Sequence, residues 1–229
     1  MAAIFDGFPK TGTKFLKGLE KNNNKAWFDD NRADYENGLL EPCKDFVAAM
    51  GPKLAKISPD IHAVPKVNGS LMRINRDTRF SKDKTPYKTY MGLWFWQGAG
   101  RSRECPGFYF GLSGDSITLG AGMHMFGPKQ LAAYRDALVH PKKGPAGRKL
   151  YDKTAKLKGI DISGNHYKKV PRGFDADHAN ADLLRHNALY FGFTTKVPKE
   201  MHDAAATDYC INVFKQVWPL QRWLVEAIG

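Results

Sequence analysis

The residues best suited to chemistry gather in one short segment, residues 73–88, which we call the basic loop. It holds six Lys or Arg residues and two Asp, a net charge of +4, together with aromatic and turn residues. Guanidinium groups bind phosphate or carboxylate through paired hydrogen bonds, and lysines add point charges. The residues predicted to bind an anion are Arg73, Arg76, Arg79, Lys82, Lys84, Tyr87 and Lys88.

Two acidic residues of the basic loop admit two interpretations. Asp77 and Asp83 would orient the arginines toward an anion, or neutralise them. In the second case the arginines form salt bridges with these residues and with acidic residues of the first helices, and the aromatic rings only anchor a structural loop. The sequence leaves both interpretations open, and direct catalysis by the loop is a third.

The elements that must position the loop follow from the pattern on either side of it. Residues 70–75 are predicted to form a strand that places Arg73 and Asn75 on one face and Ile74 on the other. The aromatic segment 90–97 is predicted to be the next strand. A loop held between two strands can keep its side chains rigid.

Beyond the loop, three residues are secondary candidates. His124 follows two glycines on a predicted strand and could act as an acid or base, although such histidines are often structural. Lys169 and Arg172 belong to a basic and aromatic cluster that would complete an anion pocket or form a solvated connector. The seven histidines show no metal-ligand spacing, and no nucleotide-binding motif is present, so we predict no metal site and no particular cofactor.

The charge of the chain is concentrated in its middle. The net charge is +12, and residues 142–173 hold ten Lys or Arg against two Asp, a net of +8. Such a field attracts polyanions, including nucleic acid. The alternative is a solvated lysine-rich face that keeps the protein soluble.

The overall composition is that of a globular protein with a substantial core. Of 229 residues, 42% are hydrophobic and 12% aromatic. No apolar run is long enough to cross a membrane, and the first residues lack the order of a signal peptide. Three widely spaced cysteines form no disulfide or zinc pattern and are expected to be buried. We therefore expect a cytoplasmic protein without membrane insertion.

Helices, then clustered strands, then helices follow one another along the chain. Helices are predicted near residues 15–19, from Lys25 with Asn24 as its cap, from Pro42 and from Pro128, whereas residues 140–149 are predicted to be a connector. Strands are predicted over 90–97, 107–112, 116–126 and 189–194, joined by short turns. This order predicts an α+β fold, one domain over residues 1–229, with a central, mainly antiparallel sheet flanked by N-terminal and C-terminal helices.

Several segments carry a family resemblance. The run RINRDTRFSKDKTPYKT over residues 73–89, the asparagines 22–24 followed by Trp27 and Phe28, and the segment VPRGF at residues 170–174 resemble the family of uncharacterised microbial and fungal proteins called domain of unknown function 2461. The similar segments extend over about residues 5–215. The resemblance implies a single domain of this length and implies no activity.

Three functions remain compatible with the sequence. The first is a binder of a phosphorylated or carboxylated small molecule, or an enzyme acting on one, with the basic loop as its site. The second is a nucleic-acid-associated protein that uses residues 142–172 as its basic face. The third is a structural module with no ligand.

Overall fold

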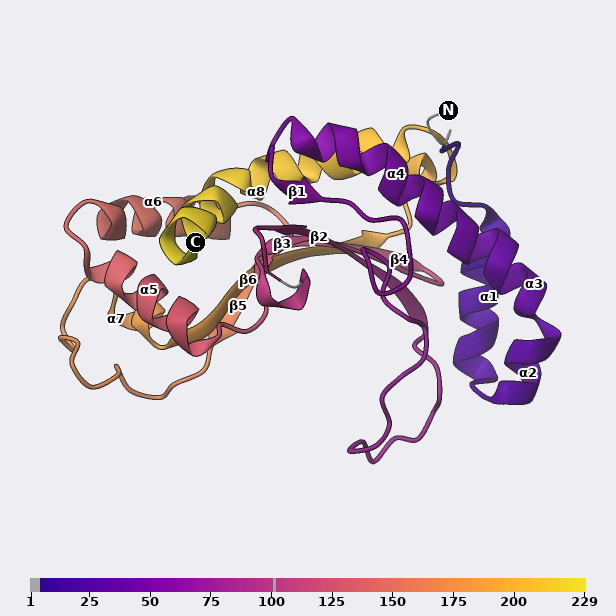
Figure 1. The fold of residues 1–229 in the computed structure, drawn as a ribbon, viewed down its shortest axis with the longest axis horizontal. Helices are drawn as coiled ribbons and strands as arrows, with labels where there is room; N and C mark the ends of the chain where they lie inside the picture. Colours follow the sequence, from indigo (N-terminus) through magenta and orange to yellow (C-terminus); the bar gives the residue numbers. More distant parts are fainter. Residues whose placement is uncertain (1–4, 101) are drawn as a thin grey trace. The chain divides into compact units, whose positions relative to one another are not determined.

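The computed structural model describes residues 5–100 and 102–229 and has an α+β fold (Figure 1). Its strands form one antiparallel six-stranded sheet in the order β1-β2-β3-β4-β6-β5, and helices precede and follow them in the chain. The strands are β1 (Ile61–His62), β2 (Tyr90–Gln97), β3 (Gly107–Ser113), β4 (Ser116–Met123), β5 (Ile160–Asn165) and β6 (His186–Lys196). The predicted fold class is therefore confirmed.

The contacts between residues divide the chain into two compact units. Unit 1 comprises the described residues of 1–95, 109–119 and 194–212, and unit 2 comprises those of 96–108, 120–193 and 213–229. The boundaries fall inside β2, β3, β4, β6 and the last helix. That residues 1–229 form one domain stays a prediction.

Unit 1 holds the N-terminal helices. They are α1 (Lys10–Lys21), α2 (Lys25–Asp30), α3 (Arg32–Tyr35), the π-helix η1 (Glu36–Leu40), α4 (Glu41–Ala55) and, later in the chain, the 3-10 helix η3 (Lys199–His202). The side chain of Asn24 accepts the backbone N–H of Trp27 at 3.0 Å, which confirms the predicted cap of α2. The apolar face of α4 buries Phe46, whose ring lies 4.8 Å from the ring of Phe110 on β3.

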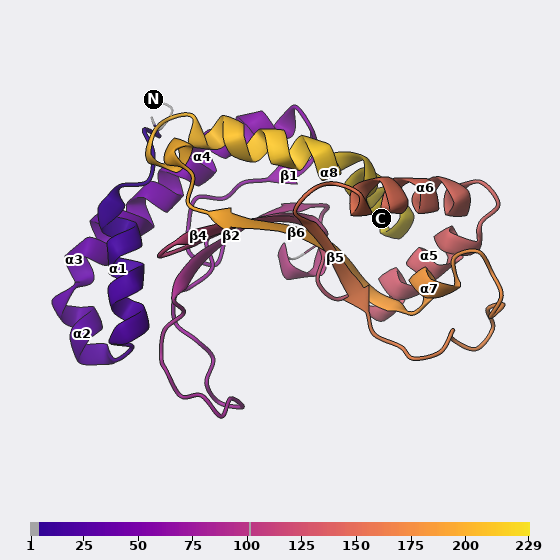
Figure 2. The same cartoon turned by 180° about the vertical axis from the view of Figure 1, so that it is seen from behind.

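Unit 2 holds the 3-10 helix η2 (Ser102–Glu104), α5 (Pro128–Val139), α6 (Lys143–Ala155), α7 (Ala181–Leu184) and most of α8 (Ala206–Ile228). In Figures 1 and 2, α5 and α6 lie beside the C-terminal part of α8. Phe214 of α8 packs on Phe108 of β3 with ring centroids 4.9 Å apart. Strand β5 pairs antiparallel with β6, and its side chains alternate between exposed and half-buried.

The prediction of a connector over residues 140–149 is wrong, because α6 already begins at Lys143. Pro145 stands in the first turn, where a missing backbone N–H costs no helical hydrogen bond. Gly147 lets α6 pack closely against the ring of Trp223. A Cβ at this position would lie 2.4 Å from the ring of Trp223, and the indole of that residue donates to the carbonyl oxygen of Lys143 at 3.0 Å.

The three cysteines, Cys43, Cys105 and Cys210, are buried and unpaired, as predicted. Burial raises the pKa of all three thiols. Among the described residues, no helix is long and apolar enough to cross a membrane.

Candidate anion-binding site

The basic loop lies between β1 and β2 along the chain and extends from unit 1 as a long projection (Figures 1 and 2). Residues 70–75 do not form the continuous strand that the sequence predicts, because Ser70 lies in a turn and Ile74 in a bend. Leu71 pairs with Leu93, and Asn75 pairs with Tyr87, each in an isolated β-bridge. The two bridges are four residues apart in the first segment and six residues apart in the second. This shift of register interrupts the ladder of hydrogen bonds and leaves only isolated bridges.

The base of the loop is fixed to the turn before α2. The side chain of Asn23 donates to the carbonyl oxygen of Tyr87 at 2.9 Å and accepts the backbone N–H of Tyr87 at 3.0 Å. The buried ring of Tyr87 stacks on Phe28 of α2, with centroids 4.2 Å apart. These contacts hold the returning arm of the loop in place, so the anchoring role considered for Tyr87 agrees with the structure.

One edge of Arg79 is engaged by a neighbouring carboxylate of the loop. Its Nε and Nη2 donate to the two oxygens of Asp77 at 3.0 and 2.7 Å, which is a bidentate pair. The guanidinium also lies over the ring of Phe80 at 5.7 Å, and that ring is 95% exposed. The edge of Arg79 best suited to an anion is therefore occupied within the loop.

Arg76 is engaged differently. Its Nη1 donates to a carboxylate oxygen of Asp83, to the hydroxyl of Thr85 and, at 3.2 Å, to the carbonyl oxygen of Thr85. Its Nε and Nη2 have no hydrogen-bond partner among the described residues. The side chain is only 25% exposed, so it is held in place while one edge of the guanidinium stays open.

Both acidic residues of the loop are stabilised as carboxylates. Hydrogen bonds from Arg79 lower the pKa of Asp77 to about 2. The backbone and hydroxyl of Thr85, followed by Arg76, lower the pKa of Asp83 to about 2. Because both groups are ionised at neutral pH, each neutralises one arginine and fixes its geometry.

The remaining cations of the loop are less constrained by acidic groups. Lys84 donates to the carbonyl oxygen of Thr78 at 2.9 Å, and Lys88 donates to the carbonyl oxygen of Arg73 at 2.8 Å. Arg73 and Lys82 are exposed and form no ion pair with any described residue. The charges of Arg73 and Lys82 are therefore not offset by a carboxylate among the described residues.

A hollow of about 400 Å³ opens at the base of the loop, and we call it the loop hollow. This volume falls in the range typical of small-molecule sites. Its walls carry two cations, two carboxylates and two phenol side chains, from Arg76, Lys88, Asp77, Asp83, Tyr87 and Tyr90. Of the predicted anion-binding residues, the structure brings Arg76, Tyr87 and Lys88 to this hollow, whereas Arg73, Arg79, Lys82 and Lys84 do not line it.

The secondary candidates belong to unit 2. His124 is exposed, and its ring centroid lies 5.0 Å from that of Tyr190. Lys169 and Arg172 are exposed in the connector between β5 and α7. None of the three lines the loop hollow, and their roles stay predictions.

Two contributors to the hollow are absent from the predicted site. In the sequence, Asn23 and Thr85 stand out only as members of segments that carry the family resemblance. In the structure Asn23 holds the base of the loop, and Thr85 positions Arg76 and Asp83. Asn and Thr side chains often bond to the backbone near turns, which was the available signal. The partner of Asn23 lies 64 residues away, and no local pattern identifies it.

The fold and the loop define an α+β protein that carries a projecting basic loop with a hollow at its base. The model of the family described as conserved hypothetical protein DUF2461 matches residues 11–223, nearly the whole chain. The chain belongs to this family. No curated protein matches it.

Proposed function

We propose that this protein binds a small phosphorylated or carboxylated molecule in the loop hollow, with Arg76 as the residue that holds the anion. The observation that carries the proposal is the open edge of Arg76. Nε and Nη2 of a guanidinium form the fork that binds two oxygens of one anion. In Arg76 this fork has no partner among the described residues, whereas in Arg79 it is occupied by Asp77.

The neighbours of Arg76 support the same role. Asp83 and Thr85 fix Nη1, so little side-chain entropy is lost when an anion binds the other edge. Lys88 lines the hollow and adds a second cation. Tyr87 and Tyr90 offer aromatic surface to the uncharged part of the ligand. Arg73 and Lys82, both exposed, attract an anion from solution without contacting it in the hollow.

The alternative of a purely structural loop rests on the same ion pairs. It accounts for Arg79 and Asp77, which satisfy each other, and for Tyr87 on Phe28. It gives no role to the open edge of Arg76 or to the hollow beside it. Arg76 is therefore the residue at which the two functions make different predictions.

The test is a thermal unfolding assay with phosphate, pyrophosphate and a panel of phosphorylated and carboxylated metabolites. We expect at least one compound to raise the melting temperature of the wild-type protein. Arg76→Lys should abolish most of that shift, because lysine keeps the charge and loses the fork. Arg79→Lys is the matched control and should preserve the shift, since Arg79 does not line the hollow and its Nε–Nη2 edge is already taken by Asp77.

Two results would refute the proposal. One is the absence of any shift across the panel. The other is an equal loss of the shift in Arg76→Lys and Arg79→Lys, because this would mean that the loop acts through its total charge alone.

A further inference from the structure

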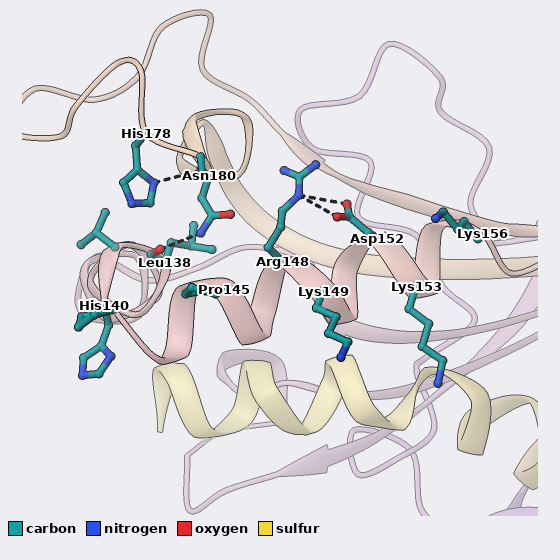
Figure 3. A pocket seen from close by; sticks show the side chains of 13 residues that line it. Leu138, His140, Pro145, Arg148, Lys149, Asp152, Lys153, Lys156, His178 and Asn180 are labelled. Atoms are coloured by element: carbon teal, nitrogen blue, oxygen red, sulfur yellow. Dashed lines mark hydrogen bonds and ion pairs between the residues drawn. The ribbon is translucent and has the colours of Figure 1, made fainter.

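A second hollow, of about 730 Å³, lies in unit 2 along the outer face of α6 (Figure 3). We call it the α6 groove. Its walls are the end of α5, the outer face of α6 from Pro145 to Lys153 with Lys156 after the helix, and residues 178–180 before α7. None of the residues that line it belongs to the basic loop.

Two lysines of α6, Lys149 and Lys153, line this groove together with Lys156, which directly follows the last residue of the helix. Lys149 and Lys153 stand at positions i and i+4, which lie on one face of a helix about 6 Å apart along its axis. In Figure 3, Lys149 and Lys153 extend from the same side of α6. All three are exposed, and none forms an ion pair with any described residue. They differ in this from Arg76 and Arg79, which bind aspartates.

The one carboxylate in the lining, Asp152, pairs with Arg148, which also binds Asp182 outside the lining. Nε of Arg148 donates to Asp152 at 3.2 Å, and its Nη1 donates to both oxygens of Asp182 at 2.7 and 2.8 Å. Figure 3 shows Arg148 and Asp152 facing each other, away from Lys149 and Lys153. The lining carries four cations and one carboxylate, a net charge of +3, and Asp182 bound to Arg148 reduces this to +2.

In two histidines of the lining, hydrogen bonds from the backbone determine which ring nitrogen carries the proton. Nδ1 of His178 accepts the backbone N–H of Asn180 at 3.0 Å, and Nδ1 of His140 accepts those of Lys142 and Lys143 at 3.1 and 3.2 Å. A backbone N–H can only donate, so the neutral ring carries its proton on Nε2 in each case. The groove thus combines unpaired ammonium groups with imidazole N–H groups.

We propose that the α6 groove binds a compact ligand carrying two or more phosphate groups. Phosphate oxygens accept from both donor types, and three lysines along the groove supply more charge than a single phosphate needs. Among the described residues no Phe, Tyr or Trp lines the groove, so only the two imidazoles could stack on nucleobases, and this favours a compact polyphosphate over single-stranded nucleic acid. This site is distinct from the loop hollow in its unit, residues and ligand.

The proposal is tested by isothermal titration of inorganic tripolyphosphate at low ionic strength. The test variant combines Lys149→Ala, Lys153→Ala and Lys156→Ala. The control combines Lys142→Ala, Lys158→Ala and Lys168→Ala, which removes the same charge from exposed positions outside the groove lining. We expect the dissociation constant to rise about tenfold or more in the test variant and about twofold or less in the control.

Three outcomes would overturn the proposal: no binding to the wild-type protein, equal weakening in both variants, or tighter binding of a single-stranded oligonucleotide than of tripolyphosphate through the same lysines. Equal weakening would mean that diffuse charge and not the groove attracts the ligand. Arg76→Lys should leave this binding unchanged. A failure of the loop proposal is therefore distinguishable from a failure of this one.

Discussion

Two arginines three positions apart in the basic loop illustrate how hydrogen-bond geometry separates residues of the same type. Arg79 donates from its Nε–Nη2 edge to Asp77, whereas Arg76 binds Asp83 and Thr85 through Nη1 alone. The first pair is an exposed ion pair that contributes little to stability. The second leaves a partly buried fork beside a hollow, which is the arrangement that anion recognition requires.

The same pairs predict how the loop responds to acid. The pKa of Asp83 is lowered from its ordinary value of 3.8 to about 2. A depressed carboxyl pKa means that the contribution of Asp83 to loop order is fully present above its ordinary pKa and is lost as the pH falls toward 2. We expect the loop to remain ordered at pH 5 and to loosen only below about pH 4.

A variant isolates one of the causes of this shift, since the backbone N–H of residue 85, the largest cause, is kept. Thr85→Val removes the hydroxyl that donates to Asp83 and should raise the pKa of Asp83 toward 3.8, as measured by NMR titration of the side-chain carboxyl carbons. Asp77 serves as the internal control and should still titrate near 2, because its partner is Arg79. An Asp83 pKa that does not move in Thr85→Val would contradict the hydrogen-bonding pattern described for the loop.

Among the elements, α6 is a helix whose start the sequence pattern does not predict. Its first turns contain Gly144, Pro145 and Gly147, which together are typical of a loop. Packing against α5 and α8 explains both glycines. A Cβ on Gly144 would lie 2.2 Å from the carbonyl oxygen of Leu138, and one on Gly147 would lie 2.4 Å from Trp223.

This packing predicts the effect of a single methyl group. Alanine is the better helix former by about 1 kcal/mol, so an isolated helix would gain from Gly147→Ala. In the protein we expect the opposite, a loss of about 1–3 kcal/mol in the free energy of unfolding, because the Trp223 ring is held by Lys143 and must shift.

Urea denaturation measures this loss. The matched control is Gly192→Ala in β6, where a Cβ would have no atom within 4 Å, and it should change the free energy of unfolding by less than about 0.5 kcal/mol. A Gly147→Ala variant as stable as the wild-type protein would contradict the close contact described between α6 and α8.

For the whole molecule, the question is whether the two units unfold together. Each of β2, β3, β4 and β6 contributes residues to both units, and α8 does so as well. Unfolding either unit alone would break these elements in the middle and expose backbone groups that are paired in the sheet. We therefore predict one cooperative transition, which agrees with the prediction of a single domain.

Thermal unfolding followed by three probes checks this prediction. Far-UV circular dichroism reports on all helices, tryptophan fluorescence of a variant that keeps only Trp27 reports on unit 1, and one that keeps only Trp223 reports on unit 2. The transitions should coincide. Separate midpoints for the Trp27 and Trp223 signals would establish two domains instead.

Charge acts at this scale too. The net charge of +12 includes one basic feature in each unit, the basic loop and the α6 groove. Both proposed sites should bind more weakly as salt is added, because mobile ions screen exposed charges.

The amino-acid sequence by itself determined the fold class, the family and the ends of several elements, such as β2 over Tyr90–Gln97, the Asn24 cap and the start of α5 at Pro128. These follow from periodicity and from contacts within a few residues, which the sequence displays directly. Only the tertiary structure decided that Arg76 keeps an open edge while Arg79 does not, that residues 143–155 are helical, and that His178 and the lysines of α6 line one groove. Each depends on which distant residues the backbone brings together, and composition and spacing do not encode that choice locally.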